Sequence, residues 1–79
     1  MHAYVLMSTG VGKMWDAAER ILKIEGVKMA NAVTGLYDVI AFVEFVDMDY
    51  LGRIIEEIQA IKGITKTQTA IVMTPRTKE

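Results

Sequence analysis

The chain contains one short motif twice: the end of an amphipathic helix, then a glycine, then the start of an apolar strand. Residues 21–27 have the sequence ILKIEGV and residues 58–64 have IQAIKGI, with the same offset at every matching position. A glycine directly after the last helical residues is typical of a left-handed helix end. Two such units in a short chain predict two βαβ-like halves, as in the split-βαβ, ferredoxin-like fold.

The periodicity of the apolar residues predicts two helices and four strands. Helices are expected at 12–25 and 48–62, where apolar residues recur on one helical face. Strands rich in β-branched and aromatic residues are expected at 2–9, 27–34, 37–46 and 64–74. The predicted class is α+β: one domain over residues 1–79, a ferredoxin-like βαββαβ sandwich with a four-stranded antiparallel sheet and both helices on one face.

The expected strand order follows from right-handed crossovers. The first and third strands are predicted to be parallel neighbours at the centre, with the second and fourth at the edges. Residues 39–46 are apolar on both faces apart from Glu44, and residues 3–7 are similar. Such runs are typical of strands that are buried on both sides. The helices bury one side, so we expect a second copy of the chain to pack against the other.

Composition excludes several classes of function. Nine Lys and Arg against ten Asp and Glu give a net charge of −1, which disfavours binding to a phosphate backbone. The chain has no cysteine, hence no disulfide, thiolate nucleophile or cysteine metal site. It has neither an apolar run long enough to span a bilayer nor a signal-peptide pattern at its start, so a cytoplasmic location and no membrane partner are expected.

Catalytic and cofactor motifs are equally scarce. His2 is the only histidine, and no Ser or Thr forms a recognisable nucleophile pattern with it. The glycines at 10 and 12 lack the spacing of a phosphate-binding loop, and no metal-ligand spacing occurs. We therefore expect a protein that is not an enzyme and that has no cofactor or metal.

The segment 34–38, TGLYD, is the most informative short stretch. It predicts a β-hairpin turn in which Gly35 adopts a positive φ. A turn at the sheet edge also gathers backbone N–H groups, Tyr37 and the Asp38 carboxylate. This combination suits a zwitterion, because a carboxylate binds an ammonium group and N–H groups bind a carboxylate.

A second polar stretch follows the second helix. Alternation is expected to place three hydroxyls on one face of the last strand, those of Thr65, Thr67 and Thr69. Threonine is common in strands, so the pattern is equally typical of an ordinary strand and of a polar pocket wall.

These two stretches resemble a known family. The sequence VTGLYD at 33–38, followed by an apolar strand, resembles the V-x-G-x-Y-D hairpin of the Lrp/AsnC effector domain, also called the RAM domain. Residues 61–69 are similar to its P-G-V-x-x-T-x-T segment, with Lys62 in place of the proline. The resemblance extends over nearly the whole chain.

The resemblance implies an amino-acid-binding oligomer. RAM domains dimerise through their sheets, assemble further, often to octamers, and bind amino acids where dimers meet. The family's hairpin residues correspond to Gly35, Leu36, Tyr37 and Asp38, with Thr65, Thr67 and Thr69 as the less secure part of the site. Asp38 would pair with the ligand ammonium, and N–H groups near Gly35 would hold its carboxylate.

The resemblance also has implications for partners. The helix-turn-helix of full-length members is missing from this sequence, which implies a stand-alone module without direct nucleic-acid contact. A full-length Lrp/AsnC-type regulator is an implied partner, because the interfaces would be alike.

Three alternatives remain at this point. An RNA-recognition motif has the same element order, and Tyr4 and Phe42 suit base stacking, but Asp38 stands where that motif needs a basic residue. An ACT-type regulatory domain also binds amino acids, and the glycines at 10 and 12 hint at its first turn. A dimeric αβ-barrel enzyme would need a buried acid–base group, for which His2 is the only histidine.

Overall fold

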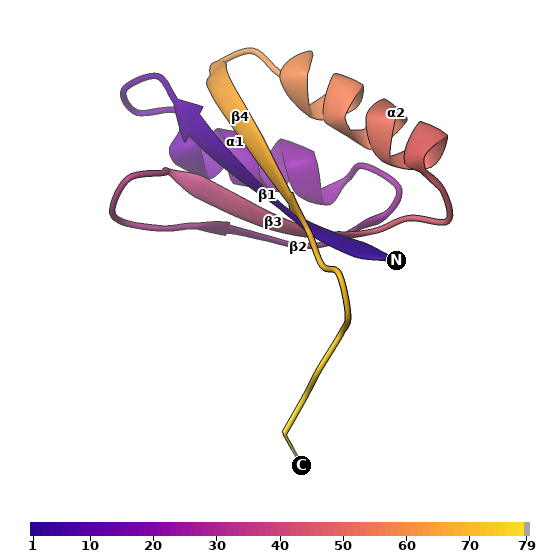
Figure 1. The fold of residues 1–79 in the computed structure, drawn as a ribbon. Helices are drawn as coiled ribbons and strands as arrows, with labels where there is room; N and C mark the ends of the chain where they lie inside the picture. Colours follow the sequence, from indigo (N-terminus) through magenta and orange to yellow (C-terminus); the bar gives the residue numbers. More distant parts are fainter. Residues whose placement is uncertain (79) are drawn as a thin grey trace.

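The structure, a computed structural model, describes residues 1–78, and Glu79 lies outside the described residues. Its elements occur in the predicted order βαββαβ (Figure 1). They are β1 (His2–Thr9), α1 (Met14–Leu22), β2 (Val27–Ala32), β3 (Val39–Glu44), α2 (Met48–Gln59) and β4 (Ile64–Ile71). The α+β, ferredoxin-like class is confirmed.

Every predicted element exists, but all except β1 are shorter than expected. Helix α1 begins at Met14 rather than at residue 12, because Gly12 lies in a turn with a φ of 76°. Strand β2 ends earlier and strand β3 begins later than predicted, because residues 33–38 form the loop that connects them. The chain beyond β4 leaves the sheet and runs away from it (Figure 1).

The strands are arranged in the order β2-β3-β1-β4, and every neighbouring pair is antiparallel. The predicted central and edge strands are confirmed, but the predicted parallel pairing of β1 and β3 is wrong: His2 lies opposite Glu44, and Met7 lies opposite Val39. Helix α1 returns the chain so that β2 runs in the direction of β1. The hairpin then reverses the chain, so β3 runs against both.

The repeated motif forms the same structure in both halves. Gly26 and Gly63 have φ values of 98° and 106°, which confirms both as left-handed positions. Each copy has the same two backbone hydrogen bonds: Ile24 N to Ile21 O (3.0 Å) and Val27 N to Ile24 O (3.1 Å), then Ile61 N to Ile58 O (3.1 Å) and Ile64 N to Ile61 O (3.3 Å). The repeat is therefore structural as well as sequential.

The core lies between the sheet and the two helices, which cover the same face (Figure 1). Its buried side chains alternate along β1 and β3 and meet the apolar stripes of both helices; they include Val5, Met7, Val39, Val43, Ile21, Leu51, Ile54 and Ile58. The N-terminus of α2 is capped by Asp47, whose side chain accepts a hydrogen bond from the Tyr50 N–H at 2.8 Å.

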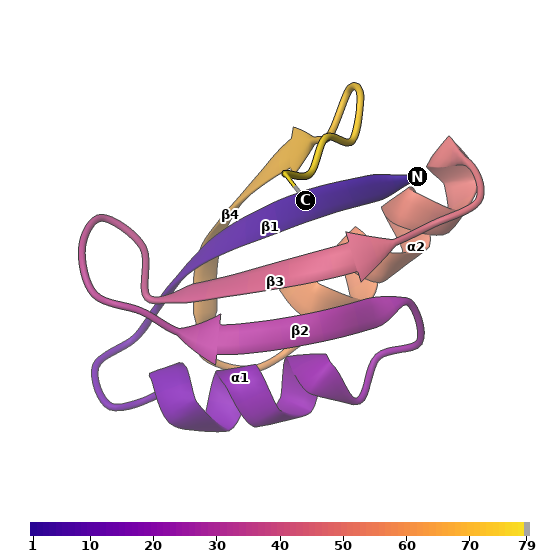
Figure 2. The same ribbon diagram turned by 90° about the horizontal axis from the view of Figure 1, so that it is seen from below.

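The opposite side of the sheet, called the open face below, is not covered by a helix (Figure 2). It carries the alternate residues of the central strands: His2, Tyr4, Leu6, Ile40, Phe42 and Glu44. Tyr4 is 43% exposed, and its ring packs against that of Phe42 at a centroid distance of 5.0 Å. The apolar outer surface predicted from the sequence is thus present.

Candidate functional site

The hairpin between β2 and β3 is closed and anchored by backbone hydrogen bonds. Val33 N donates to Asp38 O at 2.9 Å, and Asp38 N donates to Met7 O on β1 at 2.8 Å. Gly35 has the predicted positive φ, at 117°, and a Cβ added there would meet no atom within 4 Å. Leu36 at the tip is 87% exposed. The hairpin base is therefore fixed to the sheet while its tip projects from it.

Asp38 is held by the end of β1. Its Oδ2 accepts a hydrogen bond from the Thr9 N–H at 2.8 Å and lies 3.5 Å from the Thr9 hydroxyl. Its other oxygen, Oδ1, makes no hydrogen bond with residues 1–78. The carboxylate is half-buried and oriented, with one oxygen available to an incoming cation.

Tyr37 reaches across the sheet. Its hydroxyl forms a hydrogen bond with Oε1 of Gln68 on β4, so the side chain spans the intervening strand β1. Gln68 lies opposite Leu6, which places it on the open face. Neither Gln68 nor Thr9 was predicted from the sequence. Gln68 lies within the threonine stretch and could have been predicted from it. Thr9 contributes its backbone N–H, a role that the residue type does not reveal.

The predicted threonines occupy a different side of the sheet. Thr67 and Thr69 lie opposite Met7 and Val5, whose side chains are buried beneath the helices. The Thr67 hydroxyl accepts a hydrogen bond from Gln59 Nε2 at 3.1 Å. Thr65 falls where the register between β1 and β4 shifts. Among residues 1–78, no hydrogen bond joins these threonines to the hairpin.

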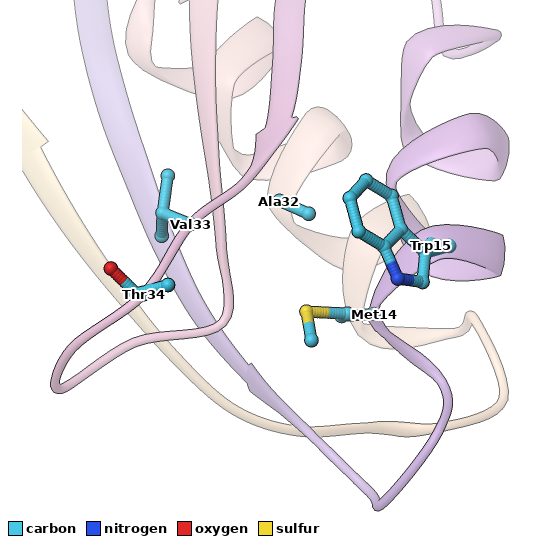
Figure 3. A pocket seen from close by; sticks show the side chains of 5 residues that line it. All are labelled: Met14, Trp15, Ala32, Val33 and Thr34. Atoms are coloured by element: carbon cyan, nitrogen blue, oxygen red, sulfur yellow. The ribbon is translucent and has the colours of Figure 1, made fainter.

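Two separate depressions lie near the predicted site, although Gly35, Leu36, Tyr37 and Asp38 line neither of them. One, of about 460 Å³, lies between the start of α1 and the end of β2 and is lined by Met14, Trp15, Ala32, Val33 and Thr34 (Figure 3). The other, of about 360 Å³, is lined by Gln59, Ile64, Thr65, Lys66 and Thr67.

His2 belongs to the far end of the open face. Its ring stacks on Phe42 with centroids 5.0 Å apart and an interplanar angle of 11°. Its Nε2 lies 3.3 Å from Glu44 Oε2, and Lys28 Nζ lies 3.6 Å from the other Glu44 oxygen. Within residues 1–78, no three His, Cys, Asp or Glu side chains gather as metal ligands, and no helix is long and apolar enough to cross a membrane.

Comparison with known proteins identifies the family of the chain. Residues 2–79 match the family model of the Lrp/AsnC ligand binding domain. The chain belongs to this family. Membership in the Lrp/AsnC family replaces the ACT-type and RNA-recognition alternatives, and it confirms the resemblance carried by the hairpin and the threonine strand.

The curated relatives match this chain over only part of their own longer sequences. Homocitrate synthase of Sulfolobus acidocaldarius is 41% identical over 58 residues, which are 73% of this chain and 12% of that enzyme. The HTH-type transcriptional regulator LysM of Saccharolobus solfataricus is 31% identical over 73% of this chain and 41% of its own length. This chain thus spans less than half of either relative, and the match to the enzyme covers only a small part of it.

A solved structure has almost the same extent as this chain. Hypothetical protein PHS023 from Pyrococcus horikoshii is 35% identical, with a TM-score of 0.83 over 94% of this chain and 90% of that one. Sequences similar to this chain therefore occur both within longer proteins and as nearly the whole of a solved chain.

Proposed function

We propose that this chain is a regulatory module that binds an amino acid at contacts between its subunits, without enzymatic activity. Membership in the Lrp/AsnC ligand-binding family supports the ligand-binding part. The near-complete coverage of the PHS023 chain supports a module that acts as a separate protein. The observation that carries the site is the anchored Asp38 carboxylate.

The ammonium group of the ligand binds Asp38 in this proposal. The Thr9 N–H already occupies Oδ2 and orients the carboxylate, so Oδ1 is the oxygen that meets the ammonium. A charge-assisted hydrogen bond of this kind is stronger than one between neutral groups. N–H groups near Gly35 hold the ligand carboxylate, because the hairpin tip is exposed and a Cβ at that position would meet no neighbouring atom.

The rest of the site comes from a neighbouring subunit. Within one chain Thr67 and Thr69 face the helix side of β4, away from the Tyr37–Gln68 hydrogen bond on the open face. Thr65, Thr67 and Thr69 of one subunit therefore close the site formed by Gly35, Leu36, Tyr37 and Asp38 of another. This arrangement requires at least two subunits.

The primary dimer in this proposal forms through the open face. Tyr4, Leu6, Ile40 and Phe42 present an apolar surface on the two central strands. Burying such a surface contributes about 25 cal/mol per Å². Dimers then assemble further, up to an octamer, and a full-length Lrp/AsnC-type regulator can join through the same surfaces. Ligand binding shifts this assembly only as far as it favours one state.

Native mass spectrometry with the twenty amino acids tests the binding site. We expect the wild-type oligomer to retain one or more amino acids. Asp38→Asn keeps an oxygen that can accept the Thr9 hydrogen bond but removes the charge, so we expect its affinity to fall about ten- to a hundredfold. Asp49→Asn, an exposed carboxylate in the first turn of α2, is the matched control. Equal affinity in Asp38→Asn and the wild type would contradict the assigned role.

A further inference from the structure

Three side chains, here called the charged row, cross one end of the sheet on adjacent strands. His2 on β1 lies directly opposite Glu44 on β3, and Lys28 lies on β2, the neighbouring strand (Figure 2). The Glu44 carboxylate is shared: its Oε2 lies 3.3 Å from His2 Nε2, and its Oε1 lies 3.6 Å from Lys28 Nζ. One carboxylate therefore has a lysine ammonium on one side and, on the other, an imidazole that can become a cation.

The His2 ring is also part of the aromatic surface of the open face. It stacks on Phe42 with an interplanar angle of 11°, and Phe42 in turn packs against the ring of Tyr4. The His2 side chain keeps only 31% of its surface exposed, whereas the side chains of Glu44 and Lys28 keep 51% and 57%. A second chain that covers Phe42 and Tyr4 therefore covers His2 as well and removes its ring from water.

Within residues 1–78, Glu44 is the only carboxylate at ion-pair distance from His2. On the other side of β1, the Val72 N–H donates to the His2 carbonyl at 2.9 Å, and residues 69–73 contain no charged side chain. The Met1 amino group, the other titratable group at this end of β1, donates to the Phe45 carbonyl at 2.9 Å. Any positive charge on His2 must therefore be balanced by the carboxylate that already faces Lys28.

The net charge of the charged row depends on the protonation of His2. Histidine is the side chain that gains or loses a proton between about pH 5 and 8. While His2 is neutral, Lys28 and Glu44 balance each other. Once His2 is protonated, two cations share one carboxylate and one positive charge is left over. Removing such a charge from water costs free energy, and a twofold contact contains two of these rows.

From this arrangement we infer that His2 makes the sheet-to-sheet dimer sensitive to pH: the dimer forms while His2 is neutral and weakens when His2 is protonated. The inference rests on the proposed dimer through the open face and adds a condition for its formation. Because the dimer binds fewer protons than two separate chains, its association constant falls as the pH falls. The proposed ligand site combines residues from different subunits, so acid also reduces binding of the amino acid.

Sedimentation of the ligand-free protein over a dilution series, at about pH 7.5 and at about pH 5.5, tests the inference. The concentration at which half of the chains are monomeric should rise at least about tenfold when the wild type is acidified. His2→Gln stays neutral and retains every carboxylate, so it should dimerise equally well at both pH values. His2→Arg is charged at both, so it should dimerise at neutral pH as weakly as the acidified wild type.

Two further measurements connect the effect to the charged row. His2 is the only histidine, so its imidazole proton resonances should show that it gains its proton over the pH range in which monomers appear. Glu44→Gln leaves Lys28 and protonated His2 without their shared anion, so it should weaken the dimer at both pH values. Circular dichroism checks that each variant is folded, and His2→Asn replaces His2→Gln if that variant is unfolded.

The outcomes separate this inference from the proposed function. If the wild type and His2→Gln form dimers and respond equally to acid, the inference is overturned and the dimer through the open face stands. If the wild type is monomeric at both pH values over the whole dilution series, the proposed dimer is contradicted, and the inference fails with it.

Discussion

The Asp38 carboxylate accepts a hydrogen bond from the Thr9 N–H at 2.8 Å, across 29 residues of sequence. This bond fastens the hairpin between β2 and β3 to the last residue of β1. The same side chain is the proposed partner of the ligand ammonium, so its structural and binding roles must be separated by experiment.

Asp38→Ala removes both roles. We expect it to lower the free energy of unfolding by about 1–3 kcal/mol, because a backbone N–H loses a charged acceptor. Asp38→Asn should lose less stability, since its amide oxygen can still accept from Thr9. Urea unfolding measures both values. If the two variants were as stable as the wild type, the Thr9 bond would contribute nothing to the hairpin's anchoring.

The cap of α2 gives a second prediction. Asp47→Ala should destabilise the chain by about 1 kcal/mol, because the Tyr50 N–H at the start of the helix loses its acceptor. Asp49→Ala removes an acidic residue of the first turn that does not cap the helix, and it should cost less. Thermal unfolding of the pair compares the two effects, and an equal loss in both would argue against the cap.

The left-handed glycines should differ in their tolerance of alanine. A Cβ on Gly26 would lie 2.7 Å from Ile54 Cδ1 and 3.1 Å from Glu44 O, whereas one on Gly35 would meet nothing within 4 Å. Both substitutions cost about 1 kcal/mol or more for the positive φ, and Gly26→Ala adds a clash in the core. Unfolding midpoints in urea should therefore fall further for Gly26→Ala. The reverse order would contradict the packing described around Gly26.

The open face predicts the outcome of one charge substitution. Phe42→Glu places a carboxylate among Tyr4, His2 and their counterparts in the proposed dimer, so we expect the sheet-to-sheet contact to be lost. The core on the helix side should keep the chain folded. Analytical ultracentrifugation compares this variant with Met48→Glu, which should retain the wild-type mass.

The positions of the helices and strands were predictable because local signals determine them. Gly26 and Gly63 follow the two helices at matching places, and the structure repeats the backbone hydrogen bonds around them. The direction of β3 relative to β1 was predicted wrongly. That direction depends on the crossover and the hairpin taken together, and a rule for one crossover alone does not determine it.

The candidate site was only partly predictable. Gly35 was placed correctly in a positive-φ turn, because residue type and backbone geometry are directly related there. The partners of Asp38 and Tyr37 were not predicted. Thr9 acts through a backbone N–H, and Gln68 reaches Tyr37 only because β4 lies beside β1 in the folded sheet.

The sequence by itself determined the element order, the left-handed glycines after both helices, the hairpin turn and the apolar character of both sheet faces, since each follows from residue type and periodicity. Only the tertiary structure decided which residues meet across strands. It placed Thr67 on the helix side and Gln68 on the open face, and it left Trp15 exposed beside the edge of β2. These outcomes depend on strand register and on how helices pack on the sheet, which are set by contacts between segments far apart in the chain.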